Sequence, residues 1–347
     1  MRALVLVLPL LLSACPPTLS RSRSPAFDAR LAQAERDAHH GRDDEAAAGF
    51  GEAAALAERR VDRDEARYRQ ARTLHDAGQH AEALALFDAI AATRPTSRRT
   101  VRALFDASKL RQEQGDTVGA QAGFLRVVRE HPESGVAGRA LHWLLRGETP
   151  GSTVARLVSL DAEVGETSLG DDILMRMHDE HVALEELAAA REDLELLVER
   201  HPYPHGERWD DAILLLAAMD LQAQDPDAAL ERLERMLERA ESTHLSGSYT
   251  LPGFPKAHLL IAQIHRDAVA TDAARRSDAD RWYRTLEDEF PTSLLRDDAA
   301  VERAFMWLDA GDTERGCAIL EDALEEFEVG HARRLGAERH ARDCTPE

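Results

Sequence analysis

The sequence predicts an all-α protein in which helix pairs stack side by side into an α/α superhelical solenoid of about eight pairs. Glycines recur at an interval of 37 residues, at Gly41, Gly78 and Gly115. Aligned columns of apolar and small residues keep that interval, and so do the prolines Pro95 and Pro132. A fixed period of this size is typical of repeat architectures, whose units bury their apolar faces only against their neighbours.

Residues 1–14 form the first element, which we expect to be a secretory signal peptide. Arg2 precedes an apolar run from Ala3 to Leu12, and two small residues then lead into Cys15. This order describes a signal peptide. The apolar run is shorter than the ~20 residues that a membrane-spanning helix needs.

The stretch Leu12-Ser13-Ala14-Cys15 resembles the processing site of bacterial lipoproteins. The resemblance implies that the signal peptide is removed and that the thiol of Cys15 receives lipid, palmitate included. Several acyl chains together hold a protein stably to a membrane. An Asp in the place of Pro16 would favour the inner membrane, so we expect the periplasmic face of the outer membrane. An ordinary signal peptide with an incidental cysteine is the alternative.

Residues 15–26 are expected to be a polar tether, and residues 27–132 carry the clear repeats, each a helix, a turn, a helix and a stop. Glycine tolerates positive φ where the first helix ends, small residues let the paired helices approach, and proline cannot continue the second helix. The columns that keep the interval are Ala46, Ala83 and Ala120; Phe50, Phe87 and Phe124; Ala34, Ala71 and Ser108; and Leu31, Tyr68 and Phe105.

This order of small residue, glycine, alanine, aromatic and proline resembles the tetratricopeptide repeat, most clearly over residues 27–132. The usual interval is about 34 residues, and the longer one here is similar to the variant in repeat lipoproteins of the bacterial outer membrane. The resemblance implies a solenoid whose first helices line a concave surface for partners. It extends loosely to the lipoproteins of barrel assembly, secretin piloting and envelope division.

Residues 133–327 are expected to continue the same solenoid as degenerate repeats. The expected pairs lie around Ala137–Val164, over Leu174–Pro202 and Arg208–Glu241, near Trp282-Tyr283 and around Gly311. Two stretches do not fit the scheme, Gly165–Gly170 and Ser242–Pro255, and we expect the second to be a long loop. Residues 328–347 are expected to be a charged tail that frays unless Cys344 is held.

The net charge of −21 argues against a polyanionic partner such as nucleic acid. Nucleic-acid binders concentrate positive charge on one face, and no comparable basic block occurs in this sequence.

No catalytic motif stands out. The sequence has no glycine-rich phosphate loop, no Gly-x-Ser-x-Gly elbow and no His-Glu-x-x-His. His178 and His181 lie one helical turn apart and could share a metal, but no third ligand is evident, and a polar helix face is the alternative. We therefore expect no enzymatic activity, no cofactor and no metal.

A binding surface is the more promising site. The column Leu31, Tyr68 and Phe105 is expected on the inner surface, with Arg72, Lys109 and Arg102 beside it. Aromatics flanked by cations suit an extended peptide that carries a carboxylate, because aromatics and Arg dominate contact energies and Arg can bind carboxylates bidentately. The alternative is that Tyr68 and Phe105 pack between helices.

Cys317 and Cys344 would lie in an oxidising compartment and could pair. The bond would tie the C-terminal tail to the last helix pair, but spacing alone leaves the pairing open.

The expected function is therefore a lipid-anchored periplasmic scaffold that binds envelope proteins or peptides, in envelope or outer-membrane assembly. The alternative is an accessory to a peptidoglycan-acting envelope enzyme, or such an enzyme itself, and a carrier of small ligands is a third. The identity of the partner and the oligomeric state stay open.

Overall fold

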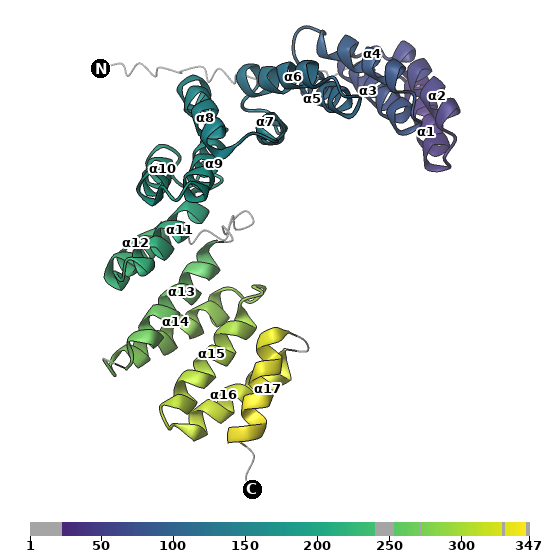
Figure 1. Ribbon diagram of the computed structural model, residues 1–347. Helices are drawn as coiled ribbons and strands as arrows, with labels where there is room; N and C mark the ends of the chain where they lie inside the picture. The colour runs from purple at the N-terminus through teal and green to yellow at the C-terminus, as the bar shows by residue number, and fades with distance from the viewer. Residues whose placement is uncertain (1–22, 240–252, 271, 328–329, 345–347) are drawn as a thin grey trace, which may run out of the picture. The chain divides into compact units, whose positions relative to one another are not determined.

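The computed structural model describes residues 23–239, 253–270, 272–327 and 330–344. These residues form seventeen helices and no strands, which confirms the all-α class (Figure 1). The chain divides into two compact units, residues 1–144 and 145–347. The signal peptide, Cys15 and residues 242–252 of the expected loop lie outside the described residues. The last three residues of that expected loop, 253–255, instead begin a helix.

The first unit consists of three successive helix pairs and one further helix. Its helices are α1 (Pro25–His39), α2 (Asp43–Leu56), α3 (Arg60–Asp76), α4 (His80–Ala91), α5 (Arg98–Glu113), α6 (Thr117–Glu130) and α7 (Ala137–Leu145). From α1 to α6, each helix packs against the next one in the chain. The expected tether therefore ends near Ser24, whose side chain caps α1 by accepting from the backbone N–H of Phe27 at 3.1 Å.

The turns within these pairs have the conformation that the repeat predicts. Gly41, Gly78 and Gly115 have φ values of +70°, +79° and +84°, a region that only glycine occupies at no steric cost. The small-residue column is fully buried, and a side chain on Gly123 of α6 would stand 2.0 Å from the hydroxyl of Ser108 on α5. Positive φ therefore fixes the glycine column, where an added Cβ would meet nothing within 4 Å, whereas close approach of the paired helices fixes the small-residue column.

The second unit consists of α8 to α17. Its helices are α8 (Pro150–Val164), α9 (Gly170–Ala183), α10 (Leu187–Arg200), α11 (Trp209–Gln222), α12 (Pro226–Glu238), α13 (Gly253–Ala268), α14 (Arg275–Glu289), α15 (Arg296–Asp309), α16 (Thr313–Glu326) and α17 (His331–Asp343). The boundary between the units falls within the pair expected around Ala137–Val164, and a single continuous stack across it stays a prediction.

Two turns of the second unit explain why its repeats are hard to see in the sequence. Glu185 joins α9 to α10 with φ of +62°, and Gln224 joins α11 to α12 with φ of +61°. These residues adopt the left-handed conformation that glycine adopts at Gly311, where φ is +80°. The turn geometry thus persists where the glycine column does not, at a cost of roughly 1–2 kcal/mol for each non-glycine residue.

The C-terminal residues form a helix, and Cys344 is held, which is the condition under which the sequence predicts that the tail does not fray. Residues 331–343 form α17, which packs against α15 and α16. Cys344, at the end of α17, forms a disulfide with Cys317 of α16, with Cα atoms 5.5 Å apart. Arg339 donates to Asp309 of α15 at 2.6 Å. These tertiary contacts order a segment that composition alone suggests is frayed.

Within the described ranges, none of these helices combines the length and apolarity that crossing a bilayer requires.

Candidate functional site

The three apolar residues expected on the inner surface are buried. Leu31 of α1 and Tyr68 of α3 are each 6% exposed, and Phe105 of α5 is 2% exposed. Leu31 belongs to a core cluster of α1, α2 and α3, and the two aromatic residues pack against the second helix of their own pair. The rings of Tyr68 and Phe87 lie 5.9 Å apart, and those of Phe105 and Phe124 lie 5.7 Å apart. Tyr68 and Phe105 therefore pack between helices and cannot offer their faces to a partner.

Tyr68 nevertheless organises the surface around it. Its hydroxyl donates to Oδ2 of Asp106, on the neighbouring first helix α5, at 2.5 Å. The guanidinium of Arg99 lies over the Tyr68 ring at 4.7 Å from its centre. Burial, followed by the hydrogen bond to Asp106, raises the pKa of Tyr68. The residue thus stays protonated and holds α3 to α5.

Phe105 supports two arginines. The guanidinium of Arg102 lies 5.8 Å from the centre of its ring, and that of Arg139, on α7, lies 5.2 Å from it. Arg102 also donates from Nε to Asp106 at 3.2 Å. Arg139 is exposed and, within the described residues, has no carboxylate at ion-pair distance. Its charge is therefore available to another molecule.

Arg139 was not among the residues expected from the sequence. It lies 37 residues after Arg102, the interval of the repeat. Extending the column of Arg102 by one unit would have found it.

Arg72 and Lys109 contribute further positive charge from the same helices. Arg72 lies 4.0 Å from Asp76 and Lys109 lies 3.9 Å from Glu113, one turn later in each helix. Side chains of both cations are more than a third exposed. Exposed ion pairs of this kind are worth at most about 1 kcal/mol, so a partner's carboxylate can compete for either cation.

The two histidines considered for a metal are instead occupied within the helix pair of α9 and α10. Nδ1 of His178 lies 3.1 Å from the carbonyl oxygen of Ala190, and Nδ1 of His181 lies 2.6 Å from Oδ2 of Asp193. All three side chains are largely buried. Among the described residues, no group of three His, Cys, Asp or Glu side chains could hold a metal ion. Packing is therefore the role that the geometry supports for both histidines.

Comparison with protein families identifies tetratricopeptide repeats at residues 65–97 and 102–134. These segments coincide with the pairs α3–α4 and α5–α6. They include every residue of the surface described above except Leu31, Arg99 and Arg139. No curated protein matches the chain.

Among solved structures, similar folds include a tetratricopeptide repeat protein from Parabacteroides merdae. It shares 17% identity, with 71% of this chain and 94% of that chain covered and a TM-score of 0.37. The tetratricopeptide-repeat domain of P58(IPK) shares 15% identity, covering 91% of this chain and 98% of its own, with a TM-score of 0.30. Human IFIT1, a dimer with PPP-AAAA, shares 14% identity, with coverage of 91% and 84% and a TM-score of 0.41.

Proposed function

We propose that this chain, which carries tetratricopeptide repeats at residues 65–97 and 102–134, is a scaffold that binds a carboxylate-bearing partner protein on the first helices of its N-terminal unit. Repeats of this kind offer extended surfaces for partners. The observation that carries the proposal is the placement of Arg102 and Arg139 around Phe105, with Arg139 exposed.

The arrangement favours binding because contact with the Phe105 ring already restrains the guanidinium groups of Arg102 and Arg139. A guanidinium stacked on a buried ring loses little side-chain freedom when it binds, and such preorganisation increases affinity. Its planar N–H groups match a carboxylate bidentately. Arg72 and Lys109 extend the same charge along α3 and α5. An extended acidic segment, or a chain terminus, is the partner chemistry that this surface fits.

We propose that Cys15 is lipidated and anchors the chain to the outer membrane on its periplasmic face, where the partners are envelope proteins engaged in envelope or outer-membrane assembly. The support is the signal-like start of the sequence. A Cys15→Ser variant is expected to leave the membrane fraction and to lose incorporation of a palmitate analogue. Equal labelling of the variant would contradict the anchor.

Binding is tested by crosslinking and co-purification from native membranes. An Arg102→Gln/Arg139→Gln variant is expected to bind its specific partners with roughly tenfold lower affinity, which corresponds to about 1.4 kcal/mol of binding free energy. The matched control is Arg67→Gln/Arg126→Gln, which removes the same charge from two exposed arginines. Arg67 and Arg72 both lie on α3. They are five residues apart, so at about 100° per residue their side chains leave the helix about 140° apart. Equal capture by both variants would contradict the proposed surface.

Absence of enzymatic activity stays a prediction. Hydrolysis of muropeptides by the purified protein, at a rate proportional to its concentration, would contradict it.

A further inference from the structure

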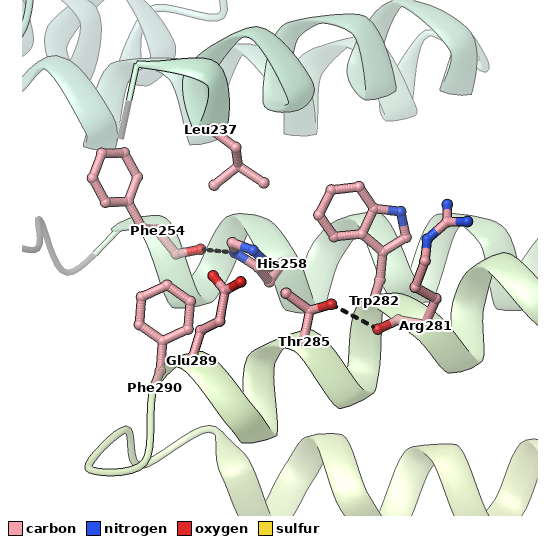
Figure 2. A pocket seen from close by; sticks show the side chains of 8 residues that line it. All are labelled: Leu237, Phe254, His258, Arg281, Trp282, Thr285, Glu289 and Phe290. Carbon is pink, nitrogen blue, oxygen red and sulfur yellow. Dashed lines mark hydrogen bonds between the residues drawn. The ribbon is translucent and has the colours of Figure 1, made fainter. Parts of the chain in front are cut away.

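A pocket in the second unit combines aromatic walls with one carboxylate (Figure 2). Its volume is about 390 Å³, within the usual range for ligand pockets. Helices α12, α13 and α14 contribute the lining. The residues used below are Phe254, His258, Trp282, Glu289 and Phe290.

The rings form a connected aromatic wall. The His258 ring lies edge to face with Trp282, at 5.3 Å between ring centres, and with Phe290, at 5.1 Å. Nδ1 of His258 lies 2.9 Å from the backbone carbonyl oxygen of Phe254, so the nitrogen donates that hydrogen bond (Figure 2). Burial lowers the pKa of His258. The imidazole is therefore neutral near pH 7 and does not repel a cation.

The uncompensated charge at the pocket is negative. Glu289 is exposed and, in the part of the chain that the structure describes, forms neither an ion pair nor a hydrogen bond. The one cation in the lining, Arg281, is already paired with Asp278 of the preceding turn at 3.0 Å. A ligand's positive charge would thus find a free carboxylate beside ring faces that attract cations.

We propose that this pocket binds the guanidinium or ammonium group of an arginine or lysine side chain of a partner protein. Aromatic faces attract such cations electrostatically, and more strongly where water is excluded. Glu289 supplies the opposite charge. The segment between α12 and α13, residues 240–252, contains neither Arg nor Lys, so it does not supply the cation itself.

This inference does not depend on the proposed function of the first unit. It uses other residues and the opposite ligand charge, so either can fail while the other holds.

The test titrates the purified full-length protein with N-acetyl-arginine-N-methylamide and, separately, with the corresponding lysine amide, and observes binding by calorimetry or ligand-detected NMR. The citrulline amide is the neutral control of similar shape. We expect millimolar affinity for at least one cationic amide and none for the citrulline amide. Glu289→Gln is expected to weaken binding roughly tenfold, which corresponds to about 1.4 kcal/mol.

The matched control is Asp288→Asn, which removes one negative charge from the adjacent exposed residue and is expected to leave the affinity unchanged. Trp282→Leu should abolish binding, provided that circular dichroism shows an unchanged helix content. Failure of both amides to bind, equal binding of citrulline, or an unchanged affinity in Glu289→Gln would overturn the proposal. Tighter binding of tetramethylammonium than of either amide would overturn the assignment to a protein side chain.

Discussion

The guanidinium of Arg139, on α7, lies 5.2 Å from the centre of the Phe105 ring on α5. A buried aromatic thereby positions an exposed cation that belongs to the next repeat. The contact also links the packing of the first unit to its surface charge. Replacing Phe105 would change the position of the Arg139 guanidinium, and replacing Arg139 would remove that charge.

Phe105→Leu is predicted to destabilise the protein more than Arg139→Gln, whereas both variants are predicted to capture less partner protein. Phe105→Leu removes buried ring atoms and should lower the free energy of unfolding by about 1–2 kcal/mol. Arg139→Gln changes an exposed side chain and should alter it by less than about 0.5 kcal/mol. Both should reduce partner capture, because both lose the stacked guanidinium. Chemical denaturation and co-purification measure the two effects. Full capture by Phe105→Leu would show that stacking on the ring is irrelevant to binding.

The repeat interval predicts the fold well where glycine marks each turn. Gly41, Gly78 and Gly115 all have positive φ, as expected. In the second unit, Glu185 and Gln224 adopt the same conformation, and no residue pattern in the sequence predicts it. Tertiary packing of the helices holds these turns against their local preference.

The candidate site is predictable only in part. The charged column from Arg102 to Arg139 follows from the interval. The burial of Tyr68 and Phe105 does not, because it depends on how each ring meets an aromatic side chain of the following helix. The pocket around His258 could not be predicted either. Its rings come from helices that only the folded chain brings together.

Glu185→Gly is predicted to stabilise the second unit. The residue is exposed and has φ of +62°, so glycine relieves strain without removing a buried contact. Part of that gain is offset by the greater freedom of glycine in the unfolded chain, and a net increase of about 1 kcal/mol in the free energy of unfolding is expected.

Gly78→Ala makes the opposite change, because it places a side chain on a residue with positive φ. Its new Cβ would meet nothing within 4 Å, so its expected loss of about 1 kcal/mol reports the backbone alone. Urea denaturation of both variants measures the difference, and a destabilised Glu185→Gly would contradict the strain argument.

Glu287 is predicted to make stability depend on pH in mildly acidic solution. Burial raises its pKa from 4.5 to about 6, and the opposing charge of Arg303, 3.1 Å away, only partly offsets this effect. Because the folded state binds the proton more tightly than the unfolded state, this group contributes most stability below pH 4.5. The contribution falls as pH rises towards about 6 and is constant above that value.

Glu287→Gln removes this titration. The difference in stability between variant and wild type should change by on the order of 2 kcal/mol across the window. Thermal denaturation from pH 4 to pH 7, with the two proteins measured side by side, tests the prediction. Parallel curves for the two proteins would contradict the raised pKa.

Breaking the bond between Cys317 and Cys344 is predicted to loosen α17 and to leave the rest of the second unit folded. The cysteines are 27 residues apart, and closing a loop of that length is worth about 3.5 kcal/mol in the chain-entropy model. The loss should be local because α17 is the last helix of the described residues and packs against α15 and α16. Arg339 would still hold α17 through Asp309, so partial and not complete fraying is expected.

Hydrogen exchange of a Cys317→Ser/Cys344→Ser variant should therefore accelerate in α17 but not in α13. Wild-type protein treated with reductant should match the variant. Alkylation of both cysteines in untreated, natively isolated protein would contradict the pairing, and unchanged exchange in α17 would show that its other contacts suffice.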